Sequence, residues 1–448
     1  MSKIIFALAT IVLLSLSGFT INIVSSYTIE TMSTGNTLYV GGTGPGNYSK
    51  IQDAIDDATD GDIIFVYSGT YFENIIIDIE DISLIGEDKN TTIIDGGLVT
   101  DTIQIIADSA VVYKFTITKG NNGGFSIKSN YSIIKDNIIT NNGKYGSWGR
   151  GITICENSHN NTISDNLISN EGEGIYVFSS NLNKILNNTF TNNEYSIYLL
   201  FSSNNNSVIG NKIQDGGPLL LSGQGYNTLS DNILISDYII VWSPYNTITN
   251  NYISKNSFEG LFFHSDEAKN NIVSGNIISE NKYGISFMEA SNNIITKNII
   301  KENKVGIRTH NDGVPDPDSI SLFNNTIIYN DFLSNKIDAV VNDNLISAFL
   351  LNFAEDIKDN INSNSDLTIN NKNYGKNNIQ NFGKYKGFHL CDFNKFKHNY
   401  WDGPRFLPKP IFGITFYPPV WTPLVFHMYL TYDLNPASKP NCDFGGED

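Results

Sequence analysis

The stretch Gly174-Ile175-Tyr176-Val177 belongs to a short apolar pattern that returns at a nearly constant spacing between residues 151 and 309. The first apolar position of each copy falls, in steps of 20 to 24 residues, at Ile152, Ile175, Ile197, Leu219, Ile239, Leu261, Ile285 and Ile307. A repeat of about 20–50 residues is typical of solenoids, propellers and repeat arrays. The chain is therefore organised by repetition of one small unit.

Each period also contains an apolar residue followed three positions later by an asparagine. These asparagines are Asn137, Asn166, Asn188, Asn211, Asn232, Asn251, Asn276, Asn298 and Asn330. Another apolar residue or pair follows each of them within two positions, so one period holds three short β-type runs and no helix-length segment. Helical repeats are excluded on this ground, and propeller blades of about 40 residues are too long. The pattern predicts a parallel β-helix with three strands in each coil.

Stacking of such coils places equivalent positions directly above one another, about 4.8 Å apart. Ile152, Ile175 and Ile197 should then form one buried column. The corner asparagines should tolerate left-handed backbone and pair from coil to coil as a hydrogen-bonded ladder. Parallel crossovers are right-handed in about 98% of cases, which predicts a right-handed helix.

At these residues the chain resembles the right-handed parallel β-helix superfamily of the pectate lyases. Within it, the repeat is similar to that of NosD-type carbohydrate-binding and sugar-hydrolysis (CASH) domain proteins of the archaeal cell surface. The resemblance implies an all-β fold, a single right-handed parallel β-helix of about 12 or 13 coils. It also implies a function connected with carbohydrate, and it leaves open whether that function is binding or catalysis.

Composition narrows the function further. The 448 residues carry a net charge of −17, which opposes binding to nucleic acid or to anionic membrane surfaces. Only three cysteines occur, so we expect no disulfide framework. A charged residue near the start and an apolar run after it predict a signal peptide, or an uncleaved anchor, at residues 1–26. We therefore expect a secreted or cell-surface protein, attached to a membrane only if that anchor is retained.

The remaining chain divides into four segments by composition. Residues 37–61 predict a strand and a helix that cap the first coil, and residues 62–341 predict the β-helix. Residues 342–391 predict an insertion with one helix. Residues 392–448 hold eight of the 13 prolines among many aromatic residues. Because proline cannot donate to a strand ladder, we expect no further coils there, but a cover over the last coil.

Alternation along the Gly-Ile strands predicts two columns of outward side chains. One column reads Thr153, Tyr176, Tyr198, Leu220, Ile240, Phe262, Ser286 and Arg308; the other reads Cys155, Phe178, Leu200, Ser222, Trp242, His264, Met288 and His310. Stacked aromatic rings suit the C–H faces of sugars. The predicted ligand contacts are Tyr176, Tyr198, Trp242 and Phe262. The alternative is that the C-terminal segment or the insertion covers this face.

The densest ionisable group of the repeat surrounds the end of the second column. The candidates for catalysis are His264, Glu289, Arg308, His310 and Asp312. A glycosidase would need two carboxylates, and a lyase a base beside a bound cation. The loop after His310 offers Asp312, Asp316 and Asp318 as ligands for an optional Ca²⁺, although it matches no EF-hand. An ordinary acidic loop is the alternative, and no other cofactor is called for.

Three functions remain open from the sequence. The favoured one is a binding or scaffold protein for a polysaccharide or another component of the cell envelope. A polysaccharide lyase or glycoside hydrolase on the same fold is the alternative. A third is NosD-like metal handling, although the four Met, three Cys and six His are scattered rather than clustered.

Overall fold

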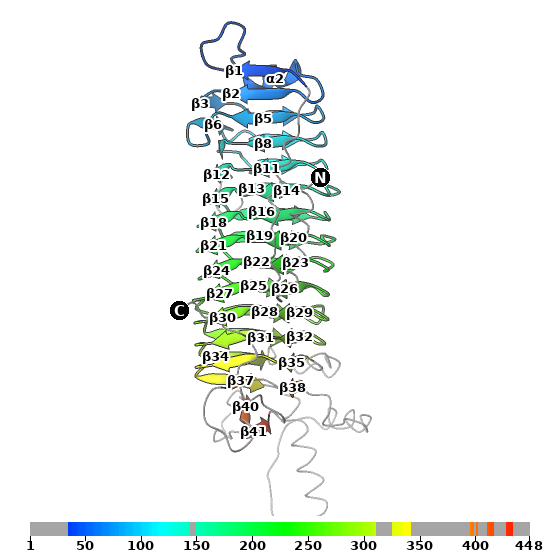
Figure 1. Cartoon of the computed structure of the whole chain (residues 1–448), viewed down its shortest axis with the longest axis vertical. Coiled ribbons are helices and arrows are strands. Elements are labelled where there is room, and N and C mark those ends of the chain that lie inside the picture. The colour runs from blue at the N-terminus through cyan, green and yellow to red at the C-terminus, as the bar shows by residue number, and fades with distance from the viewer. Residues whose placement is uncertain are drawn as a thin grey trace, which may run out of the picture. The chain divides into compact units, whose positions relative to one another are not determined.

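The computed structural model describes residues 35–143, 149–310 and 325–341, together with four strands between residues 395 and 432. The predicted segments at 1–26 and 342–391 lie outside these residues. The described chain forms three parallel sheets, and each coil adds one strand to each sheet (Figure 1). No helix in the described ranges is long and apolar enough to cross a membrane.

The first sheet, sheet A, has 14 strands. They are β1 (Thr37–Val40), β2 (Ile63–Val66), β5 (Ser83–Gly86), β8 (Val111–Tyr113), β11 (Ile133–Lys135), β14 (Thr162–Ser164), β17 (Lys184–Leu186), β20 (Ser207–Ile209), β23 (Thr228–Ser230), β26 (Thr247–Thr249), β29 (Ile272–Ser274), β32 (Ile294–Thr296), β35 (Thr326–Ile328) and β38 (Lys395–Lys397).

Sheet B follows sheet A along each coil and has 13 strands. They are β3 (Gly69–Phe72), β6 (Thr92–Asp95), β9 (Thr116–Thr118), β12 (Ile138–Thr140), β15 (Leu167–Ser169), β18 (Thr189–Thr191), β21 (Lys212–Gln214), β24 (Ile233–Ile235), β27 (Tyr252–Ser254), β30 (Ile277–Ser279), β33 (Ile299–Lys301), β36 (Asp331–Leu333) and β39 (Tyr400–Trp401).

Sheet C is formed by the Gly-Ile strands and completes each coil. Its 14 strands are β4 (Ile75–Ile77), β7 (Ile103–Ile105), β10 (Gly123–Ile127), β13 (Arg150–Ile154), β16 (Glu173–Phe178), β19 (Tyr195–Leu200), β22 (Leu219–Ser222), β25 (Ile239–Val241), β28 (Glu259–His264), β31 (Tyr283–Met288), β34 (Val305–His310), β37 (Ile337–Val341), β40 (Pro410–Thr415) and β41 (His427–Tyr432). The predicted all-β, three-stranded coil is confirmed.

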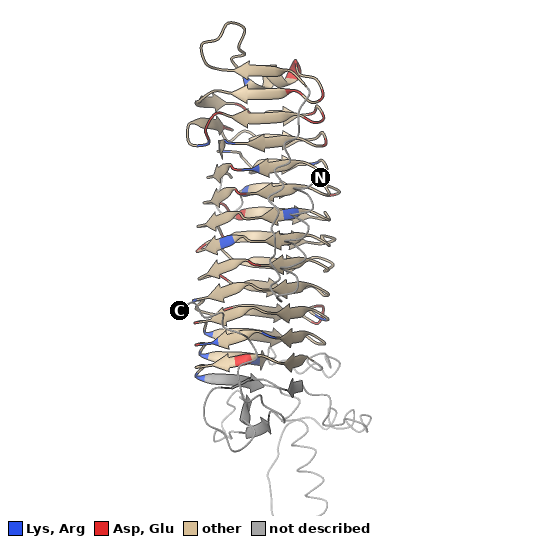
Figure 2. Ribbon diagram, viewed as in Figure 1, with Lys and Arg blue, Asp and Glu red and all other residues tan. Residues whose placement is uncertain are grey.

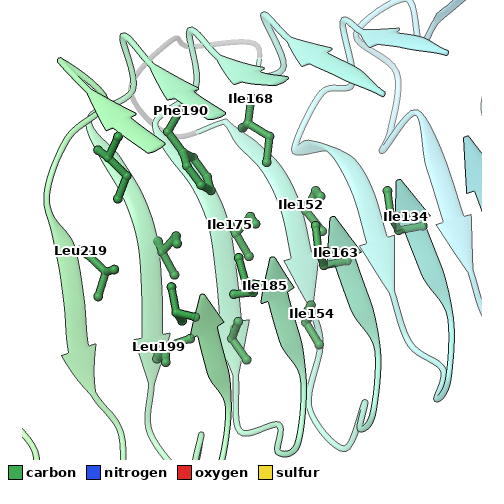
Figure 3. Close-up of a cluster of buried hydrophobic side chains, with 14 of the residues drawn as sticks. Ile134, Ile152, Ile154, Ile163, Ile168, Ile175, Ile185, Phe190, Leu199 and Leu219 are labelled. Carbon is green, nitrogen blue, oxygen red and sulfur yellow. The ribbon is translucent and has the colours of Figure 1, made fainter. Parts of the chain in front are cut away.

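The register follows the sequence repeat. Ile152 pairs with Ile175, and Ile175 with Ile197, so the predicted apolar column is continuous and fully buried. Figure 3 shows Ile152 and Ile175 in the interior, with Ile163 and Ile185 from sheet A and Phe190 from sheet B. Close packing between successive coils explains the glycine near the start of many sheet C strands, among them β13, β16, β28, β31 and β34. A Cβ on Gly174 would lie 2.6 Å from the carbonyl oxygen of Ser196 in the next coil.

The predicted asparagine ladder is present. Asn166 donates its backbone N–H to Asn188 Oδ1 at 3.0 Å, and its side-chain amide to the same oxygen and to the carbonyl of Ile134. The left-handed residue is not the ladder asparagine, as the sequence suggested, but the residue before it. Asp165 has a φ of +58°, for example. The chain therefore turns at the left-handed residue. The asparagine that follows it has ordinary backbone dihedral angles and forms the hydrogen bonds to the neighbouring coil.

Two further ladders were not predicted. One runs along the corner before sheet A, through Asn161, Asn183 and Asn206. The other lies at the corner before sheet C, where Asn142, Asn281 and Asn303 fill the ladder position. All three corners of a coil are thus held by buried side-chain amides that satisfy backbone N–H groups.

Two positions of that third ladder hold a carboxyl group, Glu171 and Asp237. Glu171 accepts hydrogen bonds from the backbone N–H and the side-chain amide of Asn142, and its own N–H donates to Asn193 Oδ1. Its side chain is almost fully buried. Burial raises the pKa of the Glu171 carboxyl to about 8, although the hydrogen bonds from Asn142 act in the opposite direction.

The first coil is capped by the helix α2 (Ile51–Asp56). Its buried residues Ile51, Ala54 and Ile55 pack on the core. Glu73, from the next coil, accepts the N–H groups of Ile51 and Gln52 at 2.9 and 3.0 Å. These contacts satisfy orphan donors at the start of the helix.

The expectation that no coil follows residue 392 is wrong. β38 and β39 pair in parallel with β35 and β36, and β40 pairs in parallel with β37. β41 then adds to β40 in antiparallel fashion. Proline density misled the prediction because the prolines avoid these ladders: β38 and β39 contain none, and Pro410 is the first residue of its strand, where proline is tolerated.

Candidate ligand-binding face

The two predicted columns exist on the outward face of sheet C. Tyr176 pairs with Tyr198, and Phe262 is joined through Ser286 to Arg308. In the second column His264 pairs with Met288, and Met288 with His310. The strand order therefore brings together side chains that lie more than 20 residues apart in the sequence. We refer to these two columns as the sheet C face.

Tyr176 has little ring surface left for a ligand. It is only 9% exposed, and the guanidinium carbon of Arg150 lies 3.8 Å from its ring centroid. Arg150 in turn donates to Glu173 Oε2 at 2.6 Å. Burial raises the pKa of the Tyr176 phenol, so the hydroxyl stays protonated and available as a donor.

Tyr198 is half-buried beside it. Its ring meets Tyr176 edge-on at 5.7 Å and stacks on Tyr195 at 5.7 Å with 24° between the planes. Burial is also the largest cause of the raised pKa of the Tyr198 phenol. This tyrosine group is held together by aromatic contacts within the face itself, and a ligand could reach only its outer edge.

Three further rings form a second aromatic group on the face. Trp242 is 38% exposed, and its ring centroid lies 5.5 Å from that of His264. Phe262 meets His264 edge-on at 5.2 Å. Two of the predicted ligand contacts, Trp242 and Phe262, are therefore neighbours through His264. This group offers an open indole beside an imidazole.

Arg308 is engaged on the face. It forms an ion pair with Glu259, donates from Nε to Ser286 Oγ at 2.9 Å, and lies 3.5 Å from the centroid of the Tyr283 ring. Those contacts occupy the guanidinium on one edge and one face. An arginine held in this way supports the surrounding side chains, and a reacting sugar would have to compete for it.

The other candidates for catalysis and metal binding are more scattered. Glu289 lies in the corner after β31, and His310 ends β34. The predicted Ca²⁺ ligands Asp312, Asp316 and Asp318 lie outside the described residues. Within the described ranges, no three His, Cys, Asp or Glu side chains are grouped so that they could hold a metal ion.

An exposed aromatic pair was missed by the sequence analysis. Tyr226 and Tyr245 lie in successive coils at the corner between sheets C and A. Their rings stack at 4.9 Å with 10° between the planes, and they are 56% and 43% exposed. Both residues have positive φ, 59° and 57°. The signal that could have found them is an aromatic residue directly before a ladder asparagine, at Asn227 and Asn246.

Comparison with known proteins assigns the chain to a family through its repeat. The profile described as "Right handed beta helix region" matches residues 82–234 and 220–393, more than half of the chain. The chain belongs to the right-handed β-helix family. The predicted handedness and fold class of this β-helix are thereby supported from sequence and structure together. No curated protein matches it significantly.

Several solved structures are weakly similar to this β-helix. An alginate lyase from a Paenibacillus species is 12% identical, with a TM-score of 0.34, over 67% of this chain and 94% of that one. The PL6 family alginate lyase AlyGC is 14% identical, with a TM-score of 0.44, over 67% of this chain and 53% of that one. The A-module of the mannuronan C-5 epimerase AlgE4 of Azotobacter vinelandii is 14% identical, with a TM-score of 0.38, over 68% and 94%. Similarity this low says nothing about the ligand of the present β-helix.

Proposed function

We propose that this β-helix binds polysaccharide along the sheet C face and the adjoining corner with sheet A. The contact surface would consist of Trp242, Phe262 and His264 on the face and of Tyr226 and Tyr245 in the corner. The outer edge of the Tyr198 group would extend it. Aromatic rings with one polar end suit sugars, which present apolar C–H faces and hydroxyl edges together.

The observation that carries this proposal is the exposed tyrosine pair, whose rings stack across two successive coils. In the corner column the residue before the ladder has a φ between 54° and 60° in every coil from Tyr131 to Asn292. Four coils use asparagine there, at Asn160, Asn205, Asn270 and Asn292. A bulky residue in this conformation costs about 1–2 kcal/mol, which asparagine largely avoids.

Tyr131 and Leu182 share this backbone and are also exposed. What distinguishes Tyr226 and Tyr245 is that their exposed rings stack on each other across two coils. Exposed apolar surface that is contiguous in this way often marks a binding site. A glycan that lies against these rings would bury them.

The proposed polysaccharide ligand also bears on where the protein is located. A protein that binds polysaccharide would act where such chains are present, and the apolar segment at residues 1–26 would direct it there. We therefore include a secreted or cell-surface location, and a component of the cell envelope as partner, in the proposal.

The test is a glycan array probed with the purified protein, followed by a reducing-end assay on every glycan that is retained. We expect retention of at least one polysaccharide and no new reducing ends. Retention of none would remove the proposed function. New reducing ends, abolished by changing Arg308 or Glu259, would replace binding with catalysis at the arginine of this face.

A further inference from the structure

The charge of the sheet C face decides what kind of polysaccharide it could hold. The eight strands from β13 to β34 contain two arginines, two glutamates and no lysine or aspartate. The cations are Arg150 and Arg308, and the anions are Glu173 and Glu259. In Figure 2 most of the ribbon along these strands is accordingly tan, with charged residues gathered toward the corners.

Each arginine is neutralised by one of the glutamates. Arg308 forms an ion pair with Glu259, and their side chains are 23% and 12% exposed. The guanidinium of Arg308 also lies over the ring of Tyr283. Arg150 is paired with Glu173 and lies on Tyr176. The same arrangement, a guanidinium between a carboxylate and an aromatic ring, thus occurs at both ends of the face.

A carboxylate on a ligand would find no unpaired arginine on these strands. To bind Arg308 it would have to displace Glu259, which is partly buried and would be left without its partner. Leaving one member of such a pair unpaired costs several kcal/mol. At long range, the net charge of −17 also repels polyanions.

We propose that the ligand of the sheet C face is an uncharged polysaccharide, and that polyuronates are excluded. This inference rests on the proposed function, since it concerns the ligand of the same face. The aromatic rings contact the apolar sides of the sugars, while the two glutamates hold the arginines away from anions. The exclusion comes from pairing within the protein rather than from a lack of cationic residues.

The test uses backbone-matched pairs of polysaccharides that differ in one carboxylate per sugar. The probes are β-1,4-glucan with β-1,4-glucuronan, β-1,4-mannan with polymannuronate, and methyl-esterified with free polygalacturonate. Affinity electrophoresis at pH 7.5 compares the members of each pair. We expect the uncharged member of at least one pair to bind at least about tenfold more tightly than its anionic counterpart. That binding should change little between ~50 and ~500 mM salt.

Two outcomes would overturn the inference in different ways. Preference for an anionic member, with binding that weakens as salt rises, would refute the uncharged ligand while leaving polysaccharide binding intact. Retention of none of the probes, together with an empty glycan array, would refute both.

A variant gives the complementary test. Glu173→Gln leaves Arg150 without its carboxylate, so affinity for the anionic probes should rise about tenfold and become sensitive to salt. Glu156→Gln is the matched control, because it removes the same unit of charge from an exposed residue in the corner after β13. Equal gains in both variants, or none in Glu173→Gln, would contradict the inference. Glu259→Gln, with thermal unfolding as a check on folding, repeats the test at Arg308.

Discussion

Replacing Glu171 with glutamine should stabilise the protein at neutral pH and above, but not in acid. Glu171 occupies a ladder position that several other coils fill with asparagine, and it accepts two hydrogen bonds from Asn142. Glutamine has nearly the same shape and can accept the same bonds. The difference between the two side chains is the charge that glutamate gains when its proton leaves, in a site that is almost fully buried.

The size of the effect follows from the pKa. The Glu171 carboxyl has a higher pKa in the folded protein than in the unfolded chain. The folded state therefore loses stability as the pH rises from the unfolded-state pKa to the folded-state pKa. For Glu171 that interval runs from the ordinary value of 4.5 to about 8. At 1.36 kcal/mol per pH unit, the 3.5 units amount to about 5 kcal/mol above pH 8, and the 2.5 units up to pH 7 to about 3 kcal/mol. Below pH 4.5 the glutamate costs nothing.

Urea unfolding of the wild type and Glu171→Gln at pH 4.5, 6, 7 and 8.5 measures this directly. Other carboxyls titrate in both proteins, so the quantity of interest is the difference in unfolding free energy between them at each pH. It should grow from near zero to several kcal/mol. The control Glu194→Gln changes an exposed glutamate one coil further on and should show no such growth. A difference that stays flat with pH would refute the reasoning.

Four more changes test the ladder, the core and the face. Asn188→Ala should cost about 2–4 kcal/mol of unfolding free energy, because buried amide donors of the preceding coil lose their acceptor; urea unfolding measures it. Thr309→Val should raise stability by about 1–2 kcal/mol, since the buried Thr309 hydroxyl has no hydrogen-bond partner within the described residues; a lower stability would contradict this. Trp242→Ala should weaken glycan binding by about 1–3 kcal/mol in titration calorimetry without moving the melting temperature. Tyr198→Ala should lower both, because its ring packs against Tyr176.

The fold was predictable because its signal is periodic. Ile152, Ile175 and Ile197 recur at the spacing that stacked coils require, and their register follows directly. The two extra ladders could not be separated from a background rich in asparagine, since no local pattern marks Asn161 or Asn142 as buried. The last coil was not predicted, for a different reason. The C-terminal segment is rich in prolines, but these prolines lie outside β38 and β39.

The candidate site was predictable only in part. Alternation placed Trp242 and His264 on the outward face, and the structure brings them into contact. The exposure of each ring depends on contacts across coils that alternation does not reveal. Arg150 covers Tyr176 from one coil away, and Glu259 reaches Arg308 from two coils away. Such pairings require the register and the side-chain conformations.

The claim that the corner tyrosines serve a ligand is tested most directly by the double variant Tyr226→Asn with Tyr245→Asn. Asparagine fits the left-handed backbone, so the variant should unfold at the same temperature or higher, while its affinity in titration calorimetry with the retained polysaccharide should fall at least about tenfold. Tyr131→Asn, an exposed tyrosine in the same column but coils away, should leave that affinity unchanged. Unaltered binding by the double variant, or a loss of stability that accounts for the loss of binding, would contradict the account.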